Sequence, residues 1–377
     1  MTSPHSTGSS PTPDPLSSLA ELRCLDHAHF WHPFTQMRDW CASEEDPLVL
    51  VSGRGAILTD AQGNDYLDGN SSIWTNLHGH RHPAIDAAIR EQLDRLAHCS
   101  ALGFANEPAI RLAAKLAEVA PGDSLTRVFF TDDGSTAVEC ACRMAAQYRE
   151  RVGETERRRF VAFDGAYHGD TIGAASLGGI PVFHGLNGAV GYPVSRFSAV
   201  KELEALDETA AREVNAVIIE PLIQGAAGMR LWPAGMLRRL REWCDRHDAF
   251  LILDEVMTGF GRTGKLFACE HEEVVPDFLC LAKGLTGGYL PLAATLTTER
   301  VFAAFLGRYE EQRTFFYGHS YCGNALACAA ALASLRVFEE ERVLGALPAK
   351  IAALADALRA GHARPRRRDR SRRGGYR

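Results

Sequence analysis

The 377-residue sequence lacks any apolar run close to the roughly 20 residues that a helix needs to cross a bilayer. Its start, MTSPHSTGSSPTPDP, has no apolar core of the kind found in signal peptides, and residues 1–20 are predicted to be disordered. The ten cysteines form no C-x-x-C pair, and several stand inside apolar segments, where a reduced thiol acts as a small hydrophobic side chain. These absences predict a cytoplasmic protein without a membrane span or a disulfide framework.

Charge is unevenly distributed along the chain. The net charge of −6 includes residues 361–377, which hold eight arginines and one aspartate, so the rest of the chain is strongly acidic. The tail has no apolar period and is predicted to be an irregular basic segment. Two explanations stay open for it: a basic arm that binds nucleic acid, which nothing else in the chain supports, or the by-product of a truncated or frame-shifted reading.

From about residue 83 onward, amphipathic helices alternate with short apolar strands such as RVFFT, RFVAF, AVIIE, FLILD and FLCLA. This alternation predicts an α/β fold in which a mostly parallel sheet is covered by helices on both faces. Earlier in the chain, residues 49–70 are predicted to form two short strands joined by turns. In parallel sheets, ligands bind at the carboxyl ends of the strands, so the residues that follow each strand are candidates for a site.

Two such residues, Asp254 and Lys283, each close an apolar strand. Taken singly, they could be a capping acid and a surface lysine. Together they suggest a pyridoxal phosphate (PLP) site, because a lysine can form a Schiff base and a carboxylate can keep the pyridine nitrogen protonated. Burial at a strand end would keep part of the lysine neutral, as nucleophilic attack requires.

Further candidates follow two other strands. Gly134-Ser135 opens a predicted helix whose free N–H groups could hold a phosphate, although Ser135 could equally be a plain helix N-cap. Tyr167 could stack on a cofactor ring or could be an ordinary packing aromatic. These residues are candidate ligands for the same cofactor as Lys283.

Three other motifs are interpreted as structural. GFGRTG (259–264) matches the spacing of a dinucleotide-binding loop, which would favour a nicotinamide oxidoreductase, but residues 254–258 separate it from the apolar run FLIL. The histidines of HGHRH match neither a closed tetrahedral metal site nor H-E-x-x-H, and no metal is expected. EHEE (270–273) is predicted to be a solvated turn.

The segments IIEPLIQGAAGM, LDEVMTGFGRTGKLFACEH, DFLCLAKGLTGGYLPLAA and YGHSYCGNALACAAA, taken together, resemble the class III aminotransferases. The likeness runs from about His29 to about Val343. FWHPFTQM and YHGDT resemble the branch of that class that transaminates 8-amino-7-oxononanoate (KAPA) in the biotin pathway, commonly with S-adenosylmethionine as amino donor.

The resemblance implies the fold-type-I architecture of PLP-dependent transferases. Residues 76–335 would form the large PLP-binding domain, and 21–75 the N-terminal segment of a small domain. Residues 336–360 would begin the C-terminal part of that small domain, which ends early here. An arginine that grips the KAPA carboxylate in the family belongs to the part that would follow.

The resemblance also implies roles for individual residues. Lys283 would be the catalytic lysine and would carry the proton in both half-reactions. The implied cofactor-binding residues are Gly134, Ser135, Tyr167, Asp254, Lys283, His319 and Ser320. The implied substrate-binding residues are Phe34, Ile73, Trp74, Tyr167, Asp170 and Gly318. Arg262 matches a family arginine to which no role is assigned.

In the family, the positions of His319 and Ser320 complete the phosphate site of the neighbouring subunit, so an obligate homodimer with shared active sites is implied. Phe34 stands where many members have Tyr, Ile73 replaces the first of two tryptophans, and GHS (318–320) stands where others have GPT. Phe34 and YGHSY resemble relatives that use lysine as donor. The sequence therefore leaves open whether S-adenosylmethionine or lysine is the donor, and another ω-aminotransferase activity remains the alternative.

Overall fold

The computed structural model describes residues 19–42, 47–184 and 190–362. The chain divides into two compact units: the smaller ends at Asn70 and includes Gly79–Arg81, and the larger comprises the remainder. The smaller unit holds two helices and an antiparallel sheet in the order β1-β2-β3. Its elements are α1 (Leu19–His29), α2 (Met37–Ala42), β1 (Leu50–Arg54), β2 (Ile57–Asp60) and β3 (Asp65–Leu67).

The third strand of this small sheet was not predicted. It forms because Asp60, which ends β2, turns the chain back on itself. The Asp60 carboxylate accepts hydrogen bonds from the backbone N–H groups of Gln62 at 2.9 Å and Asn64 at 2.8 Å, and from the Tyr66 hydroxyl at 3.0 Å. Side chains of Asp and Asn commonly stabilise turns in this way. Residues 65–67 can then pair with β2.

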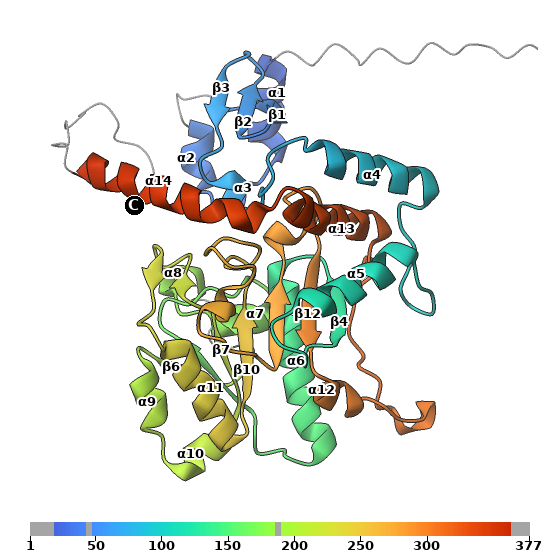
Figure 1. Ribbon diagram of the computed structural model, residues 1–377, viewed down its shortest axis with the longest axis vertical. Coiled ribbons are helices and arrows are strands. Elements are labelled where there is room, and N and C mark those ends of the chain that lie inside the picture. The colour runs from blue at the N-terminus through green and yellow to red at the C-terminus, as the bar shows by residue number, and fades with distance from the viewer. Residues whose placement is uncertain (1–18, 43–46, 185–189, 363–377) are drawn as a thin grey trace, which may run out of the picture. The chain divides into compact units, whose positions relative to one another are not determined.

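The larger unit is built on one seven-stranded sheet in the order β4-β12-β11-β10-β7-β5-β6 (Figure 1). All of its strand pairs are parallel except the two that β12 makes with β11 and β4. The strands are β4 (Arg127–Thr131), β5 (Arg159–Phe163), β6 (Val194–Phe197), β7 (Val214–Ile219), β10 (Phe250–Asp254), β11 (Phe278–Leu281) and β12 (Ala293–Thr297). The predicted α/β fold with a mostly parallel sheet is confirmed, and β6 is an addition to it.

Helices cover both faces of this sheet. Along β10, Leu251 and Leu253 belong to a core cluster shared with α5, α11 and α13, whereas Phe250 and Ile252 belong to one shared with α6 and α7. Successive side chains of a strand point to opposite faces, so a strand that is buried throughout needs cover on both sides. The longer helices are α4 (Pro83–Arg95), α5 (Glu107–Val119), α6 (Gly134–Val152), α11 (Met236–His247), α13 (Ala325–Glu340) and α14 (Val343–His362).

Short elements connect these longer ones. The short helices are α3 (Ser71–Trp74), α7 (Ile172–Leu177), α8 (Pro181–His184), α9 (Val200–Glu204), α10 (Glu208–Arg212) and α12 (Glu299–Ala303). The remaining elements are the 3-10 helices η1 (Ala268–His271), η2 (Lys283–Thr286) and η3 (Tyr309–Glu311) and the paired strands β8 (Ile223–Gln224) and β9 (Arg230–Leu231). The EHEE segment is not a solvated turn as predicted, because Glu272 is buried and accepts hydrogen bonds from the Gly235 and Arg238 N–H groups, both at 2.9 Å, where α11 begins.

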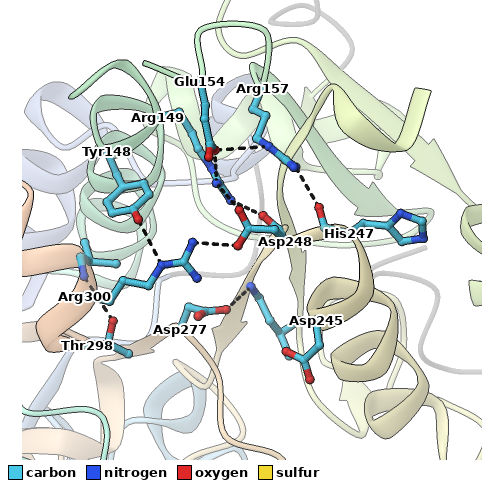
Figure 2. A network of polar contacts seen from close by, with 12 residues as sticks. Tyr148, Arg149, Glu154, Arg157, Asp245, His247, Asp248, Asp277, Thr298 and Arg300 are labelled. Atoms are coloured by element: carbon cyan, nitrogen blue, oxygen red, sulfur yellow. Dashed lines mark hydrogen bonds and ion pairs between the residues drawn. The ribbon is translucent and has the colours of Figure 1, made fainter. Parts of the chain in front are cut away.

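A network of charged side chains lies at the edge of the sheet where the parallel strands begin (Figure 2). Arg149 of α6 is 1% exposed, and its guanidinium donates to the carboxylates of Glu154 and, at 3.0 Å, Asp248, which precedes β10. Arg300 of α12 donates to the other oxygen of Asp248 at 2.7 Å. A buried guanidinium is stable only when it is paired in this way. The network joins α6 and α12 to Asp248, just before β10, at the edge of the sheet opposite the carboxyl ends of the parallel strands.

Candidate active site

A cavity of about 750 Å³ lies at the carboxyl ends of the parallel strands, where the sequence predicted a site. Segments that directly follow β4, β5, β7, β10 and β11 form most of its wall. Because β4 is antiparallel to β12, it runs in the same direction as the parallel strands, and its end opens at the same edge. The lining includes Trp74, Asp132–Ser135, Tyr167–Thr171, Glu220, Asp254, Val256, Met257, Ala282 and Lys283.

Lys283 lies in this cavity on η2, two residues after β11. Its backbone has φ 43°, and its ammonium nitrogen lies 5.3 Å from the ring centroid of Trp74. Burial lowers the pKa of Lys283 below its ordinary value, while the negative charges of Asp254 and Glu220 oppose that shift. A larger neutral fraction makes this amine a better nucleophile toward a carbonyl group.

Asp254 ends β10, which is the neighbour of β11, and is 4% exposed. Its Oδ2 lies 2.8 Å from Nδ1 of His168, whose side chain is fully buried, and its Oδ1 accepts the Val256 N–H at 3.1 Å. A buried carboxylate with these hydrogen bonds is oriented and remains available to a cationic ring nitrogen. Sequence reasoning assigned no role to His168, although it follows β5 directly beside Tyr167.

Gly134 and Ser135 form the first turn of α6. Asp133 is the N-cap, and its side chain accepts the Thr136 N–H at 2.9 Å, so the interpretation of Ser135 as a plain N-cap is wrong. A Cβ on Gly134 would lie 2.6 Å from Cγ1 of Val256, which shows that only glycine lets the helix begin this close to the segment after β10. The start of α6 therefore lies against the segment that follows β10, at Val256.

Tyr167 and Asp170 lie on the loop after β5. The Tyr167 hydroxyl donates to Oδ2 of Asp170, and burial together with this bond raises the pKa of Tyr167. The backbone N–H of Tyr167 donates at 3.3 Å to Glu220, which directly follows β7 and also accepts the Gly225 N–H at 3.0 Å. Glu220 is a cavity residue that sequence reasoning missed, and its signal was its position as the polar last residue of the apolar segment AVIIE.

Trp74 enters the cavity from a left-handed turn. Ser71, Ser72, Ile73 and Trp74 all have φ between 50° and 66°, a region that non-glycine residues rarely adopt in succession. The Trp74 carbonyl accepts a hydrogen bond from Arg262 at 2.8 Å, and Arg262 also donates to the Met257 carbonyl at 3.1 Å. Arg262 thus holds the end of this turn. Ile73 is 62% exposed and does not line the cavity.

The other residues that the sequence analysis selected lie elsewhere. Gly318, His319 and Ser320 do not line the cavity of their own chain. His319 Nε2 lies 3.3 Å from Oδ1 of Asp132, and the Ser320 carbonyl accepts a hydrogen bond from His98 at 2.8 Å. Phe34 belongs to the smaller unit.

The alternative motifs adopt ordinary local structures. GFGRTG is followed by turns and η1 rather than by a helix that could bind a dinucleotide, which argues against the nicotinamide reading. The histidines of HGHRH have separate partners: Ser334 for His78, Asp68 for His80 and Glu341 for His82. Within residues 19–42, 47–184 and 190–362, no group of three or more potential ligands is arranged for a metal ion.

All ten cysteines are free, and those predicted to lie in apolar segments (Cys140, Cys142, Cys280 and Cys328) are buried. No helix in the described parts of the chain is both long and apolar enough to span a membrane. The basic tail, apart from its first two residues, and most of the N-terminal segment predicted to be disordered lie outside the described residues.

The cavity fits an aldehyde cofactor that carries a phosphate. Its wall brings together an amine with a lowered pKa, a buried carboxylate, an aromatic side chain and the N-terminus of a helix that begins with glycine. These are the groups needed to bind an aldehyde carbon, a pyridine nitrogen, a ring face and an anion, respectively.

Comparisons with known proteins agree with this chemistry. The class III aminotransferase family matches residues 40–375. The adenosylmethionine-8-amino-7-oxononanoate aminotransferase of Nitratidesulfovibrio vulgaris (strain Hildenborough) is 54% identical over 367 residues, which cover 92% of this chain and 67% of the relative. Its counterpart from Geobacter sulfurreducens is 48% identical over 358 residues, with 90% and 78% covered.

Solved structures show the same likeness. The crystal structure of adenosylmethionine-8-amino-7-oxononanoate aminotransferase from Methanocaldococcus jannaschii superposes with a TM-score of 0.88 at 43% identity, over 92% of this chain and 80% of that one. A PLP-bound amine transaminase from an uncultivated Pseudomonas species has a TM-score of 0.80 at 36% identity, over 86% and 78%.

Proposed function

This chain belongs to the class III aminotransferases, PLP-dependent enzymes of fold type I, and we propose that it transfers an amino group to KAPA in biotin biosynthesis. The observation that carries the proposal is the placement of Lys283 and Asp254 in one cavity at the ends of two adjacent strands. Relatives named for this reaction are 36–54% identical over most of the chain, which favours KAPA over the substrates of other ω-aminotransferases.

When bound, PLP supplies an aldehyde that accepts the donor's amino group and a pyridinium ring that draws electrons from the carbon bearing that group. We assign the covalent attachment and the proton transfers to the Lys283 amine. Asp254 would hold the pyridinium proton, with His168 keeping the Asp254 carboxylate oriented at 2.8 Å. Gly134 and Ser135 would bind the phosphate through the start of α6.

Tyr167, Asp170 and Trp74 would contact substrate. The hydrogen bond from Tyr167 to Asp170 links both side chains at the cavity wall, and the Trp74 ring, 5.3 Å from the Lys283 amine nitrogen, would help to exclude water from it. Excluding water in this way keeps the amine partly neutral. Phe34 and Ile73 remain proposed substrate contacts on the family resemblance alone.

The donor is proposed to be S-adenosylmethionine, with lysine as the rival. Five carboxyl groups line the cavity, those of Asp132, Asp133, Asp170, Glu220 and Asp254, and Lys283 is the one lysine or arginine among the lining residues. Such a field favours a donor that carries a positive charge beyond its reacting amine. Both S-adenosylmethionine and lysine carry one, whereas alanine does not.

We further propose that the enzyme is a cytoplasmic homodimer with shared active sites. The family uses the position of Ser320 at a phosphate site, yet Ser320 does not line the cavity of its own chain. A second copy would supply it. The ten free cysteines agree with a reducing compartment.

The test has two parts. Purified full-length protein is reduced with borohydride and mapped by peptide mass spectrometry, and pyridoxal should be attached to Lys283. A separate, unreduced sample is mixed with each donor in turn, followed by KAPA, and the diamine product is measured, with Lys283→Ala as control. Attachment at another lysine would refute the site. Amine transfer without any conversion of KAPA would refute the substrate.

A further inference from the structure

Residues 319–322 form a tight turn. The His319 N–H donates to Sγ of Cys322 at 3.3 Å, and the Cys322 N–H donates to the His319 carbonyl at 3.2 Å. The Tyr321 N–H also donates to Nδ1 of His319 at 3.2 Å. A side-chain acceptor that bonds the N–H two residues further on stabilises a turn in the way that Asp and Asn side chains do. The His319 side chain therefore shapes the backbone on both sides of Ser320.

The other ring nitrogen of His319 ties this turn to the rest of its own chain. Because Nδ1 accepts a hydrogen bond, the hydrogen of the neutral ring is on Nε2. That nitrogen is shielded from solvent and lies 3.3 Å from Oδ1 of Asp132, which directly follows β4 and lines the cavity. The contact anchors the 319–322 turn two residues before the start of α6.

A second histidine holds the same turn at Ser320 and Tyr321. His98 Nε2 donates to the Ser320 carbonyl at 2.8 Å, and the ring centroids of His98 and Tyr321 lie 4.9 Å apart. In the parts of the chain that the structure describes, this is the one hydrogen bond that Ser320 makes, and Ser320 is exposed. Its hydroxyl is therefore left to donate to a group outside its own chain.

The contrast between Ser320 and its neighbours indicates a binding role. Groups that bind a ligand well are held beforehand by neighbouring contacts, because ordering them during binding would weaken affinity. Here the residues before and after Ser320 are both fastened, whereas its hydroxyl is unpaired. His319 also stands where others of the family have proline, which restricts the backbone by itself. The two contacts of the His319 ring supply a comparable restraint.

We propose that His319 is a positioning residue whose ring fixes the turn that presents the Ser320 hydroxyl to the cofactor phosphate of a second copy of this chain. The inference rests on the proposed homodimer, in which Ser320 completes the neighbouring site. His319 needs no contact with the cofactor for this role. Loss of its ring should weaken the binding of a phosphorylated cofactor in the other subunit and leave the attachment of the aldehyde to Lys283 unchanged.

The first test compares PLP with pyridoxal, which carries the same aldehyde and ring but no phosphate. Full-length protein is freed of cofactor and titrated with each compound, and binding is followed by the absorbance of the lysine-bound form. His319→Ala should weaken PLP binding about tenfold, the scale of one lost hydrogen bond. Pyridoxal binding should change by less than about twofold, within the noise of additive effects. His271→Ala, at an exposed histidine outside the cavity, is the matched control and should change neither.

Conservative and double variants separate this role from a general loss of structure. His319→Asn keeps an acceptor for the Tyr321 N–H but is too short to reach Asp132, and His319→Gln can reach Asp132 but has no acceptor at the position of Nδ1. Each should recover part of the PLP affinity lost in His319→Ala, and both carry the test if His319→Ala does not fold. Recovery by neither would contradict the role of the ring contacts. In a Ser320→Ala background, His319→Ala should have no further effect, because both act through the same hydroxyl.

Mixed dimers show on which subunit's site His319 acts. A Lys283→Ala chain and a His319→Ala chain with a different tag are produced together, and the dimer that carries both tags is purified. In this dimer only the His319→Ala chain has the lysine, and the chain opposite it has an unchanged His319. Its site should therefore bind PLP with the affinity of the wild type. An affinity as weak as that of the His319→Ala protein would place the effect within one chain and overturn the proposal.

The outcomes distinguish two failures. If Ser320→Ala does not change the preference for PLP over pyridoxal, Ser320 does not bind the phosphate, and the proposed shared site fails. If Ser320→Ala lowers that preference but His319→Ala does not, the shared site stands and the positioning role is wrong. Equal losses for PLP and pyridoxal in His319→Ala would also overturn the positioning role.

Discussion

Replacing Glu220 with Gln should change how the stability of the protein depends on pH. Glu220 directly follows β7, is 5% exposed, and accepts hydrogen bonds from the backbone N–H groups of Tyr167 and Gly225. Burial raises its pKa from 4.5 to about 7, and the negative charge of Asp254 adds to the shift while His168 opposes it. Gln has nearly the same shape but cannot ionise, so the variant isolates the contribution of this titration.

The sign follows from proton binding. A carboxyl whose pKa is raised on folding binds its proton more tightly in the folded than in the unfolded chain, so folding loses stability as pH rises. This loss of folding stability is absent below pH 4.5, the pKa of Glu220 in the unfolded chain. It grows up to about pH 7, the pKa in the folded protein, and is complete above that pH. A shift of this size corresponds to about 3 kcal/mol in full, of which about 2.5 kcal/mol appears between pH 5 and pH 8.

The assay is thermal unfolding of cofactor-free wild type and Glu220→Gln at pH 5 and pH 8. Gln has one acceptor oxygen for two N–H groups, so the variant carries a constant penalty of about 1–3 kcal/mol. The quantity to compare is the Tm of the variant minus the Tm of wild type. This difference should be about 3 °C more positive at pH 8 than at pH 5, given the unfolding entropy of a chain this long. Glu310→Gln, at an exposed position, is the matched control. If the difference in Tm between variant and wild type were the same at pH 5 and pH 8, the reasoning would be refuted.

Three further predictions concern catalysis. Asp254→Asn should still bind PLP but lose about 10² or more in turnover, the scale of a lost preorganised electrostatic contact, and near-normal turnover would falsify its role at the ring nitrogen. His168→Phe removes the donor that orients Asp254 and should lower turnover by about 10-fold or more, though less than Asp254→Asn; a loss equal to or greater than that of Asp254→Asn would contradict this order. Lys283→Ala and Ser320→Ala should each be impaired alone, whereas a refolded mixture should regain activity through mixed dimers with one intact site; a mixture no more active than its parts would contradict the shared site.

Local pattern was sufficient for the main features of the cavity. Lys283, Asp254 and Gly134 each follow a short apolar strand, and parallel strands end at one edge of a sheet, so strand recognition alone brought these residues together. The α/β fold was predictable for the same reason, because alternation of strands and helices is visible in the order of residues. The assignment of Lys283, Asp254 and Gly134 to a PLP enzyme then came from longer motifs whose residues and spacing are specific.

What only the tertiary structure decided involves contacts between residues far apart in the chain. Glu272 was predicted to be solvated because its neighbours are charged, yet it caps α11 from 34 residues away. His168 supports Asp254 from 86 residues away, and the loop after β5 packs closely on Ser135 because Gly169 has no side chain. The sequence by itself determined which residues end the strands. The side chains that hold those residues in place are chosen by burial and by close approach of distant segments. Neither of these can be predicted from periodicity along the chain.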